Sequence, residues 1–197
     1  MNPLKSIPGT IVSGFILAII IAFVLSTEGK VNAMEIEVWF HVLAGVVWIG
    51  LLYYFNFVQV PAVGQALAEA SSGGPGAAAI NKYVAPRALL WFRWGAVVTW
   101  LTGAGALESI GVGFVNAFTL QPNAVIIGIG AWLGTIMLFN VWVFIWPNQK
   151  KILGIVQATP EQIAQSKVVA LMASRTNALL SIPMLMCMTG HAHGLPF

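Results

Sequence analysis

Long runs of apolar residues, separated by short polar stretches, make up most of the chain. A helix that crosses a membrane needs about 20 mostly apolar residues, and five stretches reach that length. They cover residues 9–27, 36–60, 88–110, 123–146 and 168–189. The pattern predicts an all-α fold, a polytopic membrane bundle of five transmembrane helices that forms a single domain over residues 1–197.

Prolines mark expected ends and bends of these helices. Pro61 and Pro147 are predicted to close the second and fourth helices, and Pro183 to kink the fifth, because proline lacks the N–H that continues a helix. The run at 9–27 is longer than the apolar part of a cleavable signal peptide, so we expect a retained helix there.

The two longer links carry signals of their own. Residues 71–76 read SSGGPG and predict a loop, whereas residues 62–70 before it fit a short interfacial helix. Thr159, Pro160 and Glu161 predict a helix start, since threonine is a good cap and proline is favoured at the first helical position.

Composition strengthens the membrane interpretation. Of the 197 residues 58% are hydrophobic and only 8% are charged, against about 25% charged in soluble domains, and the mean hydropathy is +0.86. This balance excludes a soluble enzyme, a disordered chain and a nucleic-acid partner, and it makes the lipid bilayer the expected surroundings. The single cysteine, Cys187, excludes an intramolecular disulfide, a CxxC zinc site and covalently attached haem.

The charged residues predict an orientation. On one side of the predicted membrane lie Lys5, Lys82, Arg87, Lys150, Lys151 and Lys167, and on the other lie Lys30, Glu28, Glu35 and Glu37. Basic loops stay in the cytoplasm. We therefore expect a multi-pass protein of the bacterial inner (cytoplasmic) membrane, with its N-terminus inside and its C-terminus outside.

All three histidines fall on the outer side of that topology. His41 lies roughly 7 Å inside the second helix at 1.5 Å per residue, and His191 and His193 follow the fifth. Neutral imidazole is a common ligand of metals and of haem iron, so these three histidines are the predicted metal ligands. Two other interpretations stay open, a hydrogen bond from His41 to a backbone carbonyl and solvated histidines in the tail.

His41 belongs to a stripe along the second helix. At about 100° per residue, Gly45, Trp48 and Gln59 fall on its face and Asn56 lies beside it. We expect this stripe to face other helices. Gly45 and Trp48 are therefore candidate cofactor-binding residues with His41, although a glycine at that place also permits close packing of helices.

A second polar set lies in the inner half of the predicted membrane. Its candidate cofactor-binding residues are Arg93, Arg175 and Asn177, accompanied by the amides Asn56, Gln59 and Asn140. Arg175 would lie about 10 Å deep, where an unpaired charge is costly. We predict that it points into the bundle towards the second and fourth helices and lines a polar cavity open to the cytoplasmic side. Its partner would be one of these amides or a helix carbonyl, or else an anionic substrate, a haem propionate or a lipid headgroup.

Milder interpretations apply to several of these residues. Arg93 is shallow enough to reach the lipid headgroups. Ser174, Asn177 and Ser181 share a face that is typical of hydrogen bonding between helices, and the small-residue pair Gly130 and Gly134 is typical of close helix packing.

Four stretches, in order, resemble one known family. They are WFHVLAGVVWIG at 39–50 with YYF at 53–55, WFRW at 91–94 with TWLTG at 99–103, NVW at 140–142 with IWPNQK at 145–150, and Asn177 with SIPMLM at 181–186 and His191. Together they resemble the urate oxidase N-terminal domain, the membrane part of bacterial urate hydroxylases. The resemblance extends over most of residues 36–194.

The resemblance implies redox chemistry. Members of that family oxidise urate at the membrane and pass electrons to a cytochrome c domain fused at the C-terminus. This sequence contains no CxxCH motif, so we expect electrons to pass to a separate periplasmic cytochrome c or to a quinone. Two positions depart from the family pattern: Gly95 replaces an acidic residue, and Arg175-Thr176-Asn177 replaces a His-Asn-Asn run.

The sequence supports two hypotheses for the function. The first is a membrane oxidoreductase that binds haem b or a metal ion through the outer histidines, as the sorting of the histidines and the depth of Arg175 favour. The second is a non-catalytic membrane subunit of a larger respiratory or photosynthetic complex, which the short loops favour. A transporter is disfavoured because the chain has no internal repeat.

Overall fold

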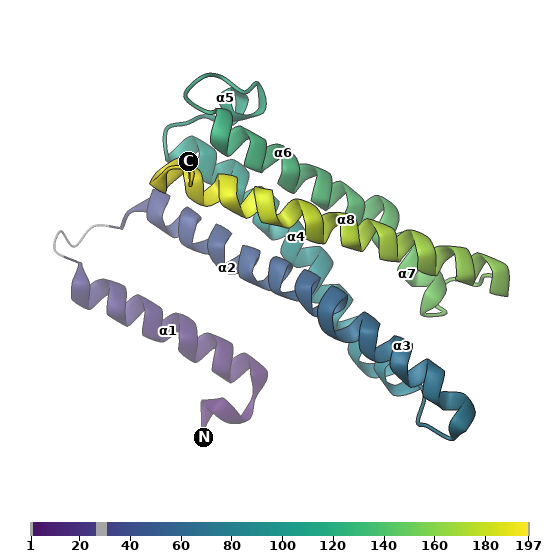
Figure 1. Cartoon of the computed structure of the whole chain (residues 1–197). Coiled ribbons are helices and arrows are strands. Elements are labelled where there is room, and N and C mark those ends of the chain that lie inside the picture. Colours follow the sequence, from purple (N-terminus) through teal and green to yellow (C-terminus); the bar gives the residue numbers. More distant parts are fainter. Residues whose placement is uncertain (1, 27–30, 197) are drawn as a thin grey trace. The chain divides into compact units, whose positions relative to one another are not determined.

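The computed structural model describes residues 2–26 and 31–196, and every regular element in those ranges is a helix (Figure 1). The predicted all-α fold is confirmed. The chain divides into two compact units, one ending at Ala33 and one beginning at Met34. The predicted helix end at Thr27 and the charges Glu28 and Lys30 lie outside the described residues.

The first unit consists of a short turn of 3-10 helix, η1 (Pro3–Lys5), and helix α1 (Ile7–Leu25). Ser6 caps α1, since its Oγ accepts a hydrogen bond from the Gly9 N–H at 3.1 Å. The helix is almost entirely apolar, as suits a helix surrounded by lipid.

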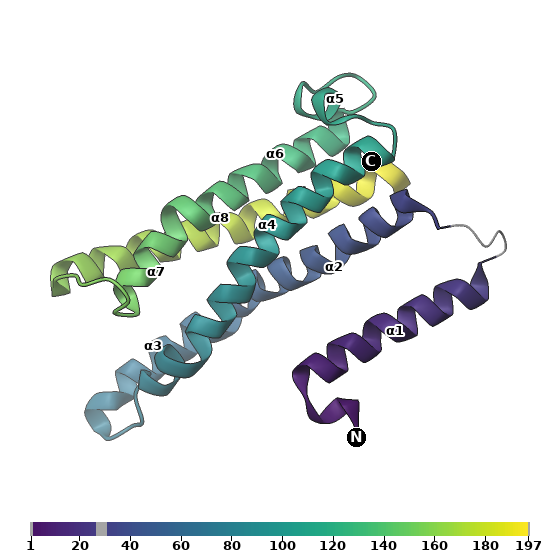
Figure 2. The same ribbon diagram turned by 180° about the vertical axis from the view of Figure 1, so that it is seen from behind.

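The second unit consists of long helical segments joined by short links. Its elements are α2 (Ala33–Tyr54), η2 (Phe55–Gln59), α3 (Val60–Glu69), η3 (Ala70–Ser72), η4 (Ile80–Val84), α4 (Ala85–Ser109), α5 (Phe114–Phe118), α6 (Val125–Phe139), η5 (Asn140–Ile145), α7 (Trp146–Ile152) and α8 (Pro160–His193). The start of α2, the link around α5 and the end of α8 lie at one end of this unit, and α3 and α7 lie at the other (Figures 1 and 2).

Among the residues that the structure describes, four helices are long and apolar enough to cross a membrane: Ile7–Leu25, Ala33–Ser72, Val125–Ile152 and Pro160–His193. They support a membrane protein with transmembrane helices. The predicted third span, residues 88–110, corresponds to α4, which has the length but a less apolar sequence because Arg87, Arg93 and several threonines and glycines interrupt it. The total of five spans and their orientation remain predictions.

Prolines do not end the helices where the sequence predicted. The helix continues through Pro61 to Ser72 and through Pro147 to Ile152, so the expected closures at Pro61 and Pro147 are wrong. A π-helical turn ends two residues before each of these prolines, η2 before Pro61 and η5 before Pro147. The same arrangement occurs at a third proline, since η4 ends two residues before Pro86. The proline ring crowds the preceding turn, and the wider π-helical turn gives it room without ending the helix.

Helix α8 is longer than the predicted fifth span, residues 168–189. It begins where the sequence predicted, with a reciprocal cap: Thr159 Oγ1 accepts from the Gln162 N–H at 3.3 Å, and Gln162 Oε1 accepts from the Thr159 N–H at 3.0 Å. It then runs through Pro183 to His193. The expected tail histidines are thus part of the last helical turn.

Apolar side chains from several helical segments fill the centre of the second unit. Its most buried members come from α2, α4, α6, η5 and α8, and include Trp48, Leu52, Phe92, Met137, Val141 and Met184. Trp48, which belongs to the stripe predicted on α2, is only 2% exposed. At this residue the stripe therefore faces the other helices, as predicted.

One face of α8 connects the bundle through polar side chains. Asn177 Oδ1 accepts from Asn140 Nδ2 at 2.8 Å, and Asn177 Nδ2 donates to the Met137 carbonyl at 2.9 Å. One turn to either side, Ser181 Oγ lies 2.9 Å from the Tyr53 hydroxyl, and Ser174 Oγ accepts from Asn56 Nδ2 at 2.9 Å. The prediction that this face joins helices is confirmed.

We expect Asn177→Leu to lower the free energy of unfolding by about 1 to 3 kcal/mol, because the half-buried Asn140 amide then loses its acceptor and the Met137 carbonyl loses its donor. Thr176→Val changes the adjacent, exposed residue and is the matched control. Thermal unfolding in detergent measures both variants. Adding Asn140→Leu should recover part of the loss, and a double variant no more stable than Asn177→Leu alone would contradict the paired interaction.

Candidate functional site

The lysines of the second unit lie at one of its ends, together with Glu69 and Glu161, whereas the other end carries acidic residues and histidines. Glu35, Glu37, Glu108, His191 and His193 lie at the end where α2 begins and α8 finishes, which we call the histidine end. Lys82, Arg87, Lys150, Lys151 and Lys167 lie at or near the other, the basic end. This separation agrees with the charge sorting seen in the sequence.

His41 of α2 lies against α4 near the histidine end. Its Nδ1 is 2.8 Å from the Thr99 carbonyl oxygen, and the side chain is half-buried. Because a carbonyl only accepts, Nδ1 carries the proton and Nε2 keeps its lone pair. The carbonyl bond that the sequence left open is thus present. It also fixes the ring as such bonds do for metal-bound histidines.

A glycine on α4 makes room for this ring. A Cβ on Gly103 would lie 2.8 Å from His41 Cε1 and 2.9 Å from Nδ1, so any larger residue would push the imidazole away. One helical turn earlier is Thr99, and one turn before that is Gly95, where a Cβ would lie 3.5 Å from the Trp48 backbone nitrogen. Small residues at four-residue spacing let membrane helices approach closely. That spacing was visible in the sequence, but it did not reveal Thr99 and Gly103 as neighbours of His41.

The contact between α2 and α4 continues towards the histidine end. Ser109 Oγ donates a hydrogen bond to Glu37 Oε2, one turn before His41. At the end of α4, Glu108 Oε1 accepts from the Phe114 N–H at 2.7 Å and so holds the start of α5. These bonds hold the end of α4 against the start of α2 and α5, next to His41.

The other two histidines lie in the last turn of α8, at the same end as the start of α2 (Figure 1). His191 is half-buried and His193 is exposed. Side chains two residues apart on an α-helix point about 200° apart around its axis. His191 and His193 therefore cannot both face His41. Within residues 2–26 and 31–196, no group of three or more His, Cys, Asp or Glu side chains is placed to hold a metal ion, and the expected site of three histidines is not formed. A pair of histidines for haem stays a prediction.

Gly45 and Trp48 keep the predicted face of α2. Gly45 lies near Thr99, whose Cγ2 would be 3.8 Å from an added Cβ, so an alanine would fit there without strain. Trp48 is buried, and no hydrogen-bond partner for its Nε1 is present among residues 2–26 and 31–196. Further along, Asn56 Oδ1 and Gln59 Oε1 are buried acceptors for which the same residues supply no donor.

Arg93 finds an aromatic partner. Its guanidinium carbon lies 3.8 Å from the centre of the Trp146 ring, and the adjacent Trp94 meets Trp142 edge-on at 5.5 Å between centroids. A guanidinium over an indole face is a favourable contact, worth about 0.5 to 2 kcal/mol. Arg93 thus connects α4 to α7, and Trp94 connects α4 to η5.

Arg175 is exposed on the surface of α8. The prediction that it points into the bundle and lines a polar cavity is wrong, and helix geometry gives the reason. Arg175 and Asn177 are about 200° apart around the axis, and Asn177 is the one that is fully buried. The face that holds Asn177 therefore excludes Arg175.

Replacing Gly103 by alanine should lower the free energy of unfolding by about 1 to 3 kcal/mol, since the new methyl overlaps the His41 ring. The control is Gly134→Ala in α6, where an added Cβ meets nothing within 4 Å and helix propensity improves by up to about 1 kcal/mol. Thermal unfolding compares the two, and equal effects would contradict the packing of His41 on Gly103.

Gln59→Met should raise the melting temperature, because removing a buried acceptor that has no donor relieves a cost of about 1 to 3 kcal/mol. Gln165→Met, on the exposed surface of α8, should leave it unchanged. A lower melting temperature for Gln59→Met would mean that a donor reaches Gln59 Oε1 in the membrane.

Comparison with known proteins adds one finding. The model of the family described as "Urate oxidase N-terminal" matches residues 106–197, just under half of the chain. Asn140, Asn177 and His191 lie inside the match, whereas His41, Gly45, Trp48 and Arg93 precede it. Searches of curated proteins and of solved structures found no match. The match supports the resemblance predicted from the sequence over residues 106–197, which are similar to the family described as "Urate oxidase N-terminal".

Proposed function

We propose that this protein is a membrane redox protein related to the membrane part of urate hydroxylases, and that it binds a b-type haem at the histidine end. The observation that carries the proposal is the bond from His41 Nδ1–H to the Thr99 carbonyl, which leaves Nε2 as a free, oriented ligand atom. The family match over residues 106–197 supports the redox class.

The residues at this end suit a haem better than a bare metal ion. Two imidazole ligands are enough for haem iron, whereas the described residues offer no cluster of three or more ligands for a metal ion. His191 is the second ligand that we propose, because it is half-buried while His193 is exposed. Bound haem would supply one-electron transfer at this end of the bundle.

The chain's own residues have defined tasks in this proposal. The Thr99 carbonyl holds the His41 ring and its proton, and Gly103 leaves the space that the ring occupies. Gly45 and Trp48 continue the same face of α2. Arg93 is held by Trp146 and Arg175 is exposed, so neither is proposed to bind a propionate or substrate.

The orientation and the partner complete the proposal. With the basic end in the cytoplasm, the histidine end faces the periplasm of a bacterium, and the protein spans its inner membrane. Electrons taken from a small molecule would then pass to a separate periplasmic cytochrome c or to a quinone. Urate is the first substrate to test, since the family model that matches residues 106–197 is described as urate oxidase N-terminal.

Absorption spectra of the purified protein, oxidised and dithionite-reduced, test the proposal. We expect a Soret band and reducible α and β bands in the wild type. His41→Ala and His191→Ala should lose them while circular dichroism still shows a helical protein. His193→Ala is the matched control, because it removes an exposed imidazole from the same helical turn, and it should keep the spectrum.

Wild-type protein that shows no Soret band after incubation with haem would refute the haem site. That result would favour the second hypothesis, a non-catalytic subunit of a larger membrane complex. Haem retained equally by His41→Ala would contradict the assignment of His41.

A further inference from the structure

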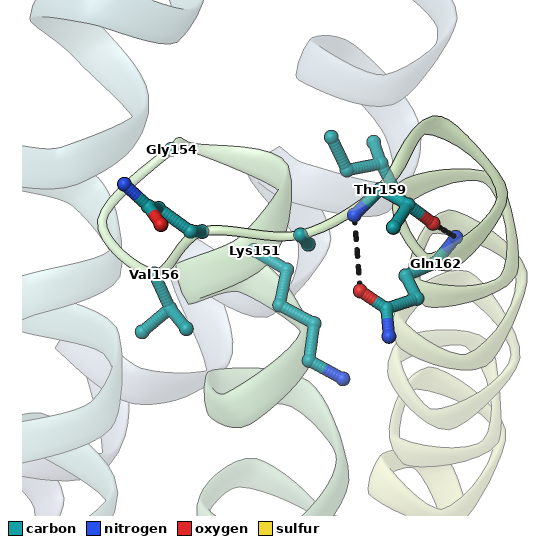
Figure 3. A pocket seen from close by; sticks show the side chains of 8 residues that line it. Lys151, Gly154, Val156, Thr159 and Gln162 are labelled. Atoms are coloured by element: carbon teal, nitrogen blue, oxygen red, sulfur yellow. Dashed lines mark hydrogen bonds between the residues drawn. The ribbon is translucent and has the colours of Figure 1, made fainter.

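A cavity of about 610 Å³ opens at the basic end, between the end of α7 and the start of α8 (Figure 3). Lys151 comes from the last turn of α7, Gly154 and Val156 from the link, and Thr159, Gln162 and Ile163 from the cap and first turns of α8. The cavity lies away from His41, and nothing proposed above uses it.

The cavity contains one cation without a partner. Lys151 is half-buried, and its side chain extends across the cavity towards the start of α8 (Figure 3). In the part of the chain that the structure describes, no hydrogen bond, ion pair or ring contact holds its ammonium group. Glu161, the acidic residue in the first turn of α8, is exposed and does not line the cavity. Lys151 therefore offers an uncompensated positive charge in a partly enclosed space.

A second donor lies next to it. Gln162 uses its Oε1 to accept from the Thr159 N–H, which leaves the Nε2 amide group as a donor on the Lys151 side of the cavity (Figure 3). The Gln162 N–H is already bonded to Thr159 Oγ1, so the helix N-terminus is not the anchor. Val156 and Ile163 add apolar side chains to the lining of the cavity.

We propose that this cavity binds a phosphate ester oxyanion, and that its occupant is the headgroup of an anionic phospholipid. An ammonium and an amide N–H suit phosphate oxygens, and Lys150, the neighbour of Lys151, adds positive charge at the same end. The cavity lies where apolar helices end, which is the depth of lipid headgroups. Val156 and Ile163 contact the glycerol and first acyl carbons.

Thermal unfolding with added lipid tests the site. The protein is purified in a mild detergent and mixed with phosphatidylglycerol, phosphatidylcholine, or soluble glycerol phosphate. We expect phosphatidylglycerol to raise the melting temperature by several degrees and to remain bound in native mass spectrometry. Phosphatidylcholine and glycerol phosphate should have little effect. An equal shift with glycerol phosphate would overturn the lipid assignment in favour of a soluble phosphate ester.

Substitutions locate the effect. Lys151→Gln should abolish the shift and the retained lipid, whereas Lys151→Arg should keep both. Lys167→Gln removes the same charge at the same end, from an exposed position outside the cavity, and should bind as the wild type does. Ala158→Phe fills the cavity without changing charge and should lose binding. Equal losses in Lys151→Gln and Lys167→Gln would overturn the site in favour of diffuse attraction to the basic end.

Discussion

The buried polar face of α8 holds the second unit together. An amide or a hydroxyl in the middle of an apolar bundle must find a hydrogen-bond partner, because no water is present to replace it. Asn177 finds its partners on α6 and η5, Ser181 on α2 and Ser174 on η2. These bonds fix the rotation of α8 about its axis, and that rotation decides which of its side chains are inside.

The π-helical turns place the partners of that face. Asn56 lies in η2 and Asn140 begins η5, and each donates its side-chain amide to α8. Both turns precede a proline that the helix passes through. The extra residue in such a turn rotates the next part of the helix relative to a regular α-helix. The same π-helical turn therefore has two effects. It accommodates the proline that follows it, and it directs an asparagine side chain towards α8.

The contact between α2 and α4 has a different basis. Small residues on α4, spaced by four, let the two backbones approach, and the larger side chains of α2 fill the space above them. His41 occupies the place above Gly103, and Trp48 lies beside Gly95. The absence of a side chain on α4 is what brings the His41 ring to the Thr99 carbonyl. The same geometry leaves Nε2 as the free nitrogen.

The sequence by itself determined the helical class, the apolar helices, the cap at Thr159 and the separation of charges between the ends, because each depends on local pattern and composition. It did not determine how the helices pass Pro61 and Pro147, since a π-helical turn leaves no separate mark in the residue order. Nor did it determine which of Arg175 and Asn177 is buried, because both are polar and only the neighbouring helices supply a partner to one of them. The partners of Arg93 and His41, the Trp146 ring and the Thr99 carbonyl, lie on helices that only the tertiary structure brings into contact.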